Sequence, residues 1–271
     1  MAPLYKTAAA VCLVALHGLQ VQAAQTTIKY KFKPVVTDDA AYFAVNLVRN
    51  GKLPVRISEV AKENNLVSTL TEKVQSKEKE KTFSGEPEEA VTIDETCSEL
   101  VEPNGLKDIF HYTFEYEEGV SQKSPNYREL LQAALDEGLK VFTDSQNQNQ
   151  WETIWQDDDG ANLAYLLGAN STAIGCVIGQ CTTEKSTTPG GRSTATPTGK
   201  AVLFCELKPA AEKSKAPFDE EYYDGLIART DKLASMTEED LKAPSNDATA
   251  TAAIPTILSA GVVAMLTVAS A

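Results

Sequence analysis

Alternating apolar and polar positions recur along the chain, and a period of two predicts β-strands with one buried face. Residues 28–33 alternate apolar side chains with lysine, which predicts either an edge strand or an extended arm. Residues 109–116 place four aromatic side chains on one face of a strand, and we expect that face to line the core. These side chains are Phe110, Tyr112, Phe114 and Tyr116. Two β-type runs, 170–181 and 201–207, are separated by turn-forming residues and predict neighbouring antiparallel strands.

Other segments repeat apolar residues every three or four positions, which predicts amphipathic helices. They are residues 37–51, a segment from Pro54 to Val74, residues 124–142 and residues 217–227. The alternating Lys/Glu run 76–81 contains no apolar residue and predicts a solvated loop or face. Helices interleave with strands without a repeated βαβ unit, so the pattern predicts an α/β sandwich with a mainly antiparallel sheet.

The two ends of the chain have the composition of processing signals. Residues 1–23 combine an early lysine, an apolar run and a small-residue cleavage site, which predicts a secretory signal peptide. A buried core helix is the alternative. Cleavage would leave one domain over residues 24–240, and its roughly 220 residues suffice for a single core. It would also remove Cys12 and His17.

At the C-terminus, a small polar segment precedes an uncharged hydrophobic tail, as in a glycosylphosphatidylinositol (GPI) signal. Residues 241–248 are the expected linker and attachment region, with Asn246 as the lipid-bearing residue and Ser245 as the alternative. The tail, residues 249–271, would then be removed. A permanent membrane helix is less consistent with the sequence because no basic residue follows the tail, and a buried terminal helix is a further alternative. The expected location is the outer face of the plasma membrane, with lipid as the only membrane contact.

The formal net charge is −13. Such a surface repels nucleic acid, sulfated glycans and anionic lipid, unless a local patch reverses the sign. We therefore expect no nucleic-acid partner.

Four cysteines remain once the signal peptide is cleaved, and an even number in a secreted chain predicts two disulfides. Cys176 and Cys181 lie about 16 Å apart on an extended strand, too far for a disulfide with each other. Their five-residue offset also points them to opposite faces, so they should have different partners. The preferred pairing is Cys176–Cys205 across the hairpin and Cys97–Cys181 across the domain.

The sequence provides little for catalysis. His111 is the one histidine outside the signal segment, and we expect it to face solvent from a strand. No nucleophile motif, P-loop or zinc motif occurs, and Asp157–Gly160 lacks the acidic residue that an EF-hand needs, so it predicts a turn. We expect no enzyme, cofactor or metal site.

Two surface features are candidates for modification and contact. Asn170 begins an N-glycosylation sequon, which could equally be a plain turn. Residues 182–200 are rich in Thr, Ser, Gly and Pro and predict a long exposed loop for antigenic display or partner contact. Its candidate contact residues are Thr183, Lys185, Arg192 and Thr198.

Several motifs of the chain resemble the surface antigens of Eimeria parasites. These motifs are residues 170–176 (NSTAIGC), 180–182 (QCT), 203–209 (LFCELKP), the segment 217–229 and the region 236–239. The resemblance implies a GPI-linked antigen of an invasive stage, associated with host-cell attachment and immune exposure. The implied partner is a protein or glycan of the host-cell surface.

A more distant resemblance is to the CAP superfamily of cysteine-rich secretory proteins. Residues 45–49 have the frame of the CAP His-Asn-x-x-Arg helix, with Val45 in place of histidine. Asn162 stands where the second cavity histidine would fall. The resemblance implies a three-layer α-β-α sandwich with a disulfide between the two hairpin strands, but without the metal-binding tetrad.

The leading hypothesis is therefore a non-catalytic, GPI-anchored parasite surface antigen that mediates host-cell attachment or invasion. One alternative is a carrier of a small apolar ligand such as a lipid or sterol. A second alternative is a secreted hydrolase whose site has no recognisable motif.

Overall fold

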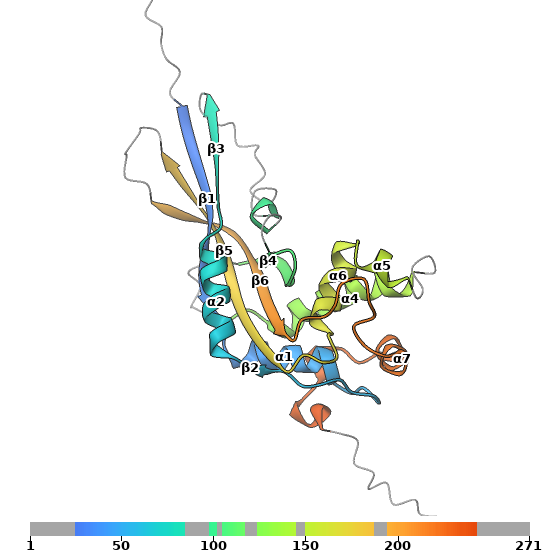
Figure 1. The fold of residues 1–271 in the computed structure, drawn as a ribbon. Helices are drawn as coiled ribbons and strands as arrows, with labels where there is room; N and C mark the ends of the chain where they lie inside the picture. The colour runs from blue at the N-terminus through green and yellow to red at the C-terminus, as the bar shows by residue number, and fades with distance from the viewer. Residues whose placement is uncertain are drawn as a thin grey trace, which may run out of the picture.

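The computed structural model describes residues 25–84, 98–101, 105–116, 124–144, 150–186 and 194–242. Figure 1 shows one sheet with helices gathered around one of its ends. The strands are β1 (Gln25–Val36), β2 (Ala61–Lys62), β3 (Glu78–Ser84), β4 (Phe110–Glu115), β5 (Ala173–Ser186) and β6 (Ala195–Lys208). The helices are α1 (Asp39–Asn50), α2 (Asn64–Gln75), α4 (Tyr127–Thr143), α5 (Trp151–Ile154), α6 (Asp158–Leu166), α7 (Glu220–Ala228) and the 3-10 turns η1 (Leu233–Ser235) and η2 (Glu238–Leu241).

The sheet runs in the order β3-β1-β5-β6-β4. These neighbours pair antiparallel, and the short β2 adds a parallel pair with β5. The mainly antiparallel sheet and the hairpin of the two cysteine strands are confirmed. The edge position of β1 was wrong, because β1 pairs with β3 on one side and with β5 on the other.

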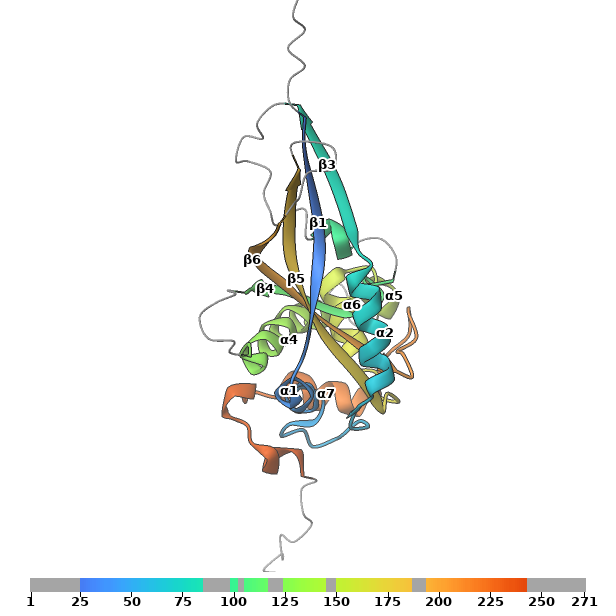
Figure 2. The ribbon, with the colours of Figure 1, turned by 90° about the vertical axis from the view of Figure 1, so that its left-hand side faces the viewer.

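The α/β character is confirmed, but the three-layer sandwich is wrong. Helix α2 packs on one face of the sheet, where Gly175 approaches the α2 backbone at Leu66 and Val67. Helices α1, α4 and α6 pack on the other face, which carries Cys176. The sheet extends well beyond these helices, and among the described residues only the short helical turn 98–101 lies against its projecting part (Figures 1 and 2). The fold is therefore a mixed α/β arrangement built around one long antiparallel sheet.

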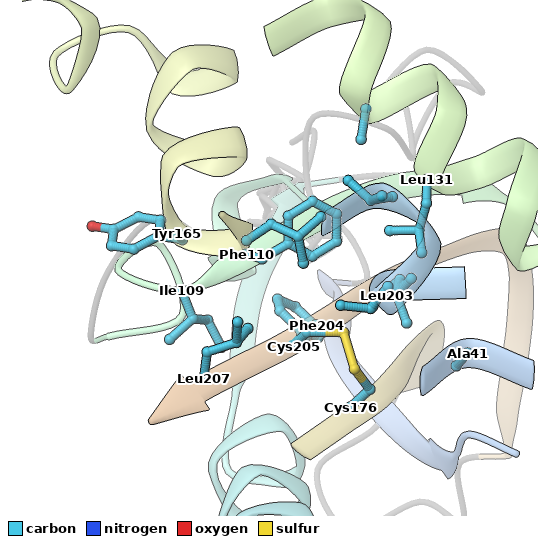
Figure 3. Close-up of a cluster of buried hydrophobic side chains, with 14 of the residues drawn as sticks. Ala41, Ile109, Phe110, Leu131, Tyr165, Cys176, Leu203, Phe204, Cys205 and Leu207 are labelled. Atoms are coloured by element: carbon cyan, nitrogen blue, oxygen red, sulfur yellow. A yellow bond between two sulfur atoms is a disulfide. The ribbon is translucent and has the colours of Figure 1, made fainter. Parts of the chain in front are cut away.

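The core occupies both faces of the enclosed part of the sheet, and one part of it lies between the sheet and α1, α4 and α6. Phe110, Leu203 and Leu207 point into it from β4 and β6, and Leu131 closes it from α4 (Figure 3). The disulfide Cys176–Cys205 crosses the same face of the hairpin, as the sequence predicted, and both cysteines are buried. The aromatic face of β4 also packs as expected, since Phe110 and Phe114 are buried and Tyr112 and Tyr116 are half-buried.

Three local predictions differ from the structure. The charged run 76–81, predicted to be a solvated face or a loop, is not a loop, because β1 supplies a partner that pairs every backbone position from Glu78 to Ser84 and makes strand β3. Glu78, Lys79 and Glu80 are exposed, as expected of a solvated face. Helix α2 begins at Asn64 rather than Pro54, and β2 precedes it. Asp157 does not lie in a plain turn; its carboxylate accepts hydrogen bonds from Asp159 and Gly160 and caps α6.

Candidate functional site

The most prominent exposed feature is the end of the sheet that projects beyond the helices, which we call the distal ribbon. It comprises residues 25–31 of β1, all of β3, residues 182–186 of β5 and residues 195–200 of β6. Figures 1 and 2 show it extending away from the helical body. The expected loop 182–200 is thus largely strand, since β5 continues to Ser186 and β6 begins at Ala195.

Cross-strand ion pairs join the strands of the ribbon on one face. Lys29 contacts Glu80 at 3.0 Å and Glu78 at 3.5 Å, and it also stands opposite Glu184 in the β1–β5 register. Lys31 pairs with Glu184. Opposite charges on facing or diagonal strand positions stabilise a sheet. The alternation of Lys and Glu therefore holds β3, β1 and β5 together on this face of the ribbon, which none of the described helices covers.

The other face of the ribbon is partly apolar. Ile28 and Tyr30 are buried there, and Lys79 and Lys81 both pair with Glu99 of the helical turn 98–101, at 2.5 and 3.2 Å. Hydrogen bonds from these two lysines lower the pKa of Glu99. The turn 98–101 is therefore tied to β3 by charge.

The four predicted contact residues have different surroundings. Lys185 is exposed on the ribbon, whereas Thr183 is half-buried and its hydroxyl donates to the Thr196 carbonyl at 3.4 Å. The Thr198 hydroxyl donates to the Cys181 carbonyl at 3.1 Å, beside the register shift between Gln180 and Thr182. Thr198 therefore supports the bulge of the hairpin. Arg192 lies outside the described residues.

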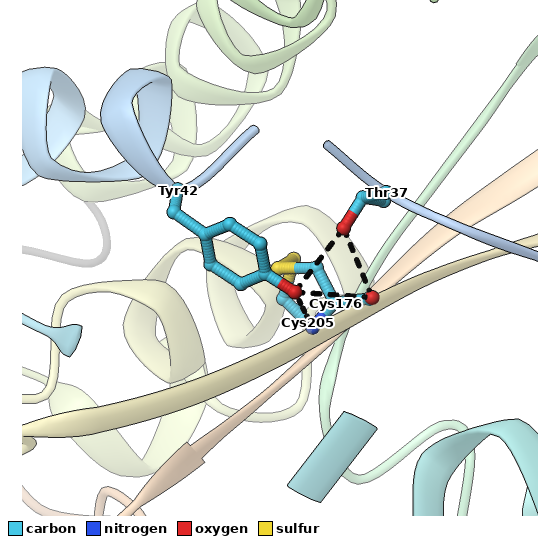
Figure 4. The surroundings of a disulfide bond; sticks show 4 residues. All are labelled: Thr37, Tyr42, Cys176 and Cys205. Atoms are coloured by element: carbon cyan, nitrogen blue, oxygen red, sulfur yellow. Dashed lines mark hydrogen bonds between the residues drawn. A yellow bond between two sulfur atoms is a disulfide. The ribbon is translucent and has the colours of Figure 1, made fainter. Parts of the chain in front are cut away.

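Thr37 and Tyr42 complete the backbone hydrogen bonding of Cys176 at the point where β1 ends (Figure 4). The Thr37 hydroxyl donates to the Cys176 carbonyl at 3.0 Å, and the Cys176 N–H donates to the Tyr42 hydroxyl at 3.4 Å. Both side chains are buried. They replace the strand partner that Cys176 lacks beyond Val36, because buried backbone groups need a partner.

The other predicted disulfide is only partly visible. Cys181 is buried and disulfide-bonded, and Cys97 lies outside the described residues. The pairing Cys97–Cys181 therefore stays a prediction.

The side chains of residues 45–49, for which the sequence suggested a CAP-type motif, make structural contacts in the described part of the chain. Val45 is fully buried. The Asn46 amide donates to the Val60 carbonyl at 2.9 Å and accepts from the Val60 N–H at 3.0 Å. Arg49 is fully buried and donates to the carbonyls of four residues, which are Ser58, Leu166, Gly168 and Ser171. The sequence held one signal for these contacts: Asn46 and Arg49 are polar residues beside the apolar stripe of this helix.

His111 and Asn162 lie together at the edge of the sheet. The side-chain amide oxygen Oδ1 of Asn162 accepts a hydrogen bond from the His111 backbone N–H at 3.0 Å. A side chain from α6 therefore satisfies a backbone donor of strand β4. The His111 ring nitrogen Nδ1 lies 3.0 Å from the Ile109 carbonyl. Burial lowers the pKa of His111. The ring is therefore half-buried and not solvent-facing as expected.

Asn170 is exposed in a turn before β5. The neighbouring Ser171 is buried, and its hydroxyl donates to the Pro209 carbonyl at 2.6 Å. The Asn170 side chain is therefore accessible for glycosylation, and the hydrogen bond of Ser171 holds the turn in place.

The last described residues lie at the end of the molecule opposite the distal ribbon (Figure 1). Arg56 donates to the backbone carbonyls of Asp240, Leu241 and Lys242. Lys52 adds an ion pair with Asp231 at 2.9 Å. From α4, Arg128 donates to the Met236 carbonyl at 2.8 Å. These contacts fasten residues 231–242 to the loop that follows α1 and to α4.

The expected attachment residues Ser245 and Asn246 lie outside the described part of the chain, as does the tail 249–271. Within the described ranges, no helix is long and apolar enough to cross a membrane. The same ranges contain no group of three His, Cys, Asp or Glu side chains arranged to hold a metal ion.

No protein-family model matches the sequence, and no curated protein sequence matches it. The solved structures to which the chain is similar include the following two. The surface antigen SAG19 of Eimeria tenella has a TM-score of 0.42 and 15% identity, over 72% of this chain and 97% of that one. A hookworm platelet inhibitor has a TM-score of 0.38 and 10% identity, over 69% of this chain and 79% of that one. Similarity at this level assigns neither a family nor a function to the chain.

Proposed function

We propose that this protein is a lipid-anchored cell-surface antigen that contacts host cells through its distal ribbon and does not catalyse a reaction. One observation carries the proposal: the ribbon and the C-terminal residues lie at opposite ends of the molecule (Figure 1). A lipid attached shortly after Lys242 would place α1 and η2 near the membrane. The ribbon would then point away from the membrane, toward another cell.

The surface of the ribbon supports a contact role. Strand pairing on several sides and the lysine–glutamate pairs hold the backbone in place, while Lys185, Thr196 and Thr82 remain exposed. An ordered backbone with exposed polar side chains loses little conformational entropy on binding.

The surroundings of His111 support a non-catalytic role. A general base must lie within hydrogen-bond reach of the group whose proton it removes. Among the described residues, no hydrogen bond joins the His111 ring to a serine, threonine or cysteine side chain.

The anchor is tested by treating intact cells with phosphatidylinositol-specific phospholipase C. We expect the protein to appear in the medium, lacking residues 247–271 by mass spectrometry. Protein that stays on the cells and retains this C-terminal peptide would exclude the anchor.

The contact surface is tested by substituting exposed ribbon residues with glutamate and measuring binding to host cells. We expect Lys185→Glu combined with Thr196→Glu to reduce binding by about tenfold, since two exposed ribbon positions become acidic. The matched control is Lys140→Glu, an exposed position on α4 in the helical body. Equal losses for the ribbon variant and the control, with thermal stability unchanged, would rule out the ribbon as the contact surface.

A further inference from the structure

A cavity of about 300 Å³ lies away from the distal ribbon, between the C-terminal end of α4, helix α5 and the N-terminal end of α7. Aromatic side chains from separate parts of the chain line it: Phe142, Trp151, Phe218 and Tyr223. Phe142 and Phe218 are buried, while Trp151 and Tyr223 are half-buried. The cavity is therefore walled by aromatic rings, two of which reach the surface.

Ring contacts fix the wall in place. The Trp151 ring packs edge-to-face on Phe142, with centroids 5.3 Å apart, and on Phe218, with centroids 5.4 Å apart. The Tyr223 hydroxyl donates to the Phe142 carbonyl at 2.8 Å and so holds its ring beside α4. Such a wall needs little rearrangement to receive a ligand.

The rim of the cavity is acidic. Asp219 and Glu220 line it, and both are exposed. The Asp219 carboxylate caps α7 by accepting the Tyr222 N–H at 2.8 Å. Among the described residues, neither carboxylate forms an ion pair with a basic side chain. Lys215, which precedes the lining residue Ala216, pairs with Glu212 instead.

Aromatic faces attract cations through their quadrupole, and weakly hydrated ammonium groups lose least on leaving water. Unpaired carboxylates at the rim add long-range attraction of the same sign. A primary ammonium or a guanidinium needs several hydrogen-bond acceptors around it, and in this cavity the two carboxylates offer acceptors only at the rim, while four of the eight lining residues are aromatic. A quaternary ammonium group needs no acceptor.

We propose that this cavity binds a quaternary ammonium group of the size of choline, whether free or in a phosphocholine headgroup. The site is independent of the proposed contact role of the distal ribbon, because the two share no residue.

Isothermal titration calorimetry on the full-length chain from a eukaryotic host tests the site with choline chloride. The neutral probe is 3,3-dimethyl-1-butanol, which has the shape of choline without its charge. We expect millimolar binding of choline and about tenfold weaker binding of the neutral isostere. Equal affinities, or no heat with choline at tens of millimolar, would overturn the proposal.

Two variants locate the binding in this cavity. Trp151→Ala removes the largest ring, and we expect choline binding to weaken by about tenfold. Glu220→Lys places a positive charge on an exposed rim position and should abolish binding without affecting folding. The matched control Glu59→Gln changes an exposed carboxylate elsewhere and should leave binding unchanged. Full affinity in Glu220→Lys would contradict the assignment.

Two further measurements distinguish a lipid headgroup from a free ligand as the source of the ammonium group. Flotation with phosphatidylcholine vesicles, competed by soluble phosphocholine, indicates a lipid headgroup. Binding of soluble phosphocholine without vesicle flotation indicates a free ligand. If phosphatidylcholine vesicles, soluble phosphocholine and choline all fail to bind, the proposed site is wrong.

Discussion

The Arg49 guanidinium is fully buried, yet it has no acidic partner among the residues to which it donates. One acceptor is the Ser58 carbonyl in the loop before β2, at 2.7 Å. The others are backbone carbonyls at the C-terminal end of α6 and in the turn that follows, including Leu166 at 2.7 Å and Gly168 at 3.0 Å. Carbonyls at a helix C-terminus lack intrahelical partners and carry partial negative charge, so a cation stabilises them. Burial lowers the pKa of Arg49 to about 10, which leaves the group charged at neutral pH.

Arg49→Met should lower the free energy of unfolding by about 3 kcal/mol or more, because several buried carbonyls lose their donor. Arg49→Lys should recover only part of this loss, since an ammonium lacks the planar fork. Urea denaturation followed by circular dichroism measures both. A Met variant within 1 kcal/mol of the parent would show that solvent satisfies these carbonyls.

His111 should make the stability depend on pH near neutrality. Burial lowers its pKa in the folded state, so the unfolded chain binds the proton more readily. Above the ordinary histidine pKa, the neutral His111 ring contributes to the free energy of unfolding. This contribution is lost as the pH falls. We expect the free energy of unfolding to drop between pH 7.5 and 5.5.

His111→Gln is the test of this assignment, because it removes the titrating ring and keeps a polar side chain on the strand. The drop between pH 7.5 and 5.5 should become smaller in this variant. An unchanged pH profile would assign the effect to other groups.

At the scale of elements, a charged pair fastens helix α2 to the sheet. Glu206 of β6 has 8% of its side chain exposed, and Lys73 of α2 contacts it at 2.6 Å. Lys208 lies 3.0 Å from the second carboxylate oxygen. Burial alone raises the pKa of Glu206, but the two ammonium groups outweigh burial and lower it. The pair therefore stabilises the fold above the ordinary pKa of glutamate, and this contribution is lost as the pH falls.

Lys73→Met should cost about 1–2 kcal/mol at pH 7, because a largely buried carboxylate loses one of its two partners. The difference from the parent should narrow as the pH falls below about 4.5, where the carboxyl takes up a proton. Thermal unfolding at pH 7 and pH 3.5 compares the two proteins. The control is Lys140→Met, at an exposed site on α4. A difference that does not change with pH would mean that packing, not charge, explains the loss.

For the molecule as a whole, the two ends of the long sheet have different roles. One end is enclosed by α1, α2, α4 and α6 and contains the core and the disulfide Cys176–Cys205 (Figure 3). The other end is the distal ribbon. Loss of the disulfide should therefore destabilise the enclosed half, on which the ribbon depends for its position.

The double variant Cys176→Ala/Cys205→Ala opens a loop whose ends are 29 positions apart. The chain-entropy model gives a loss of about 3–4 kcal/mol for a loop of this length. Urea denaturation without reductant measures it, because reductant would also act on Cys181. A loss under about 1 kcal/mol would show that strand pairing alone fixes the hairpin.

The sequence by itself determined the elements whose pattern is local. The apolar stripe of α1, the aromatic face of β4, the long helix α4 and the paired cysteine strands follow from periodicity and from the reach of a disulfide. The tertiary structure alone decided the rest. Strand β3 and the polar end of β5 become strands because β1 lies between them, and the polar end of β6 then pairs with β5. No local pattern of Lys, Glu and Thr predicts a distant partner. The aromatic cavity likewise brings together Phe142, Trp151 and Phe218, which only the packing of α4, α5 and α7 makes neighbours.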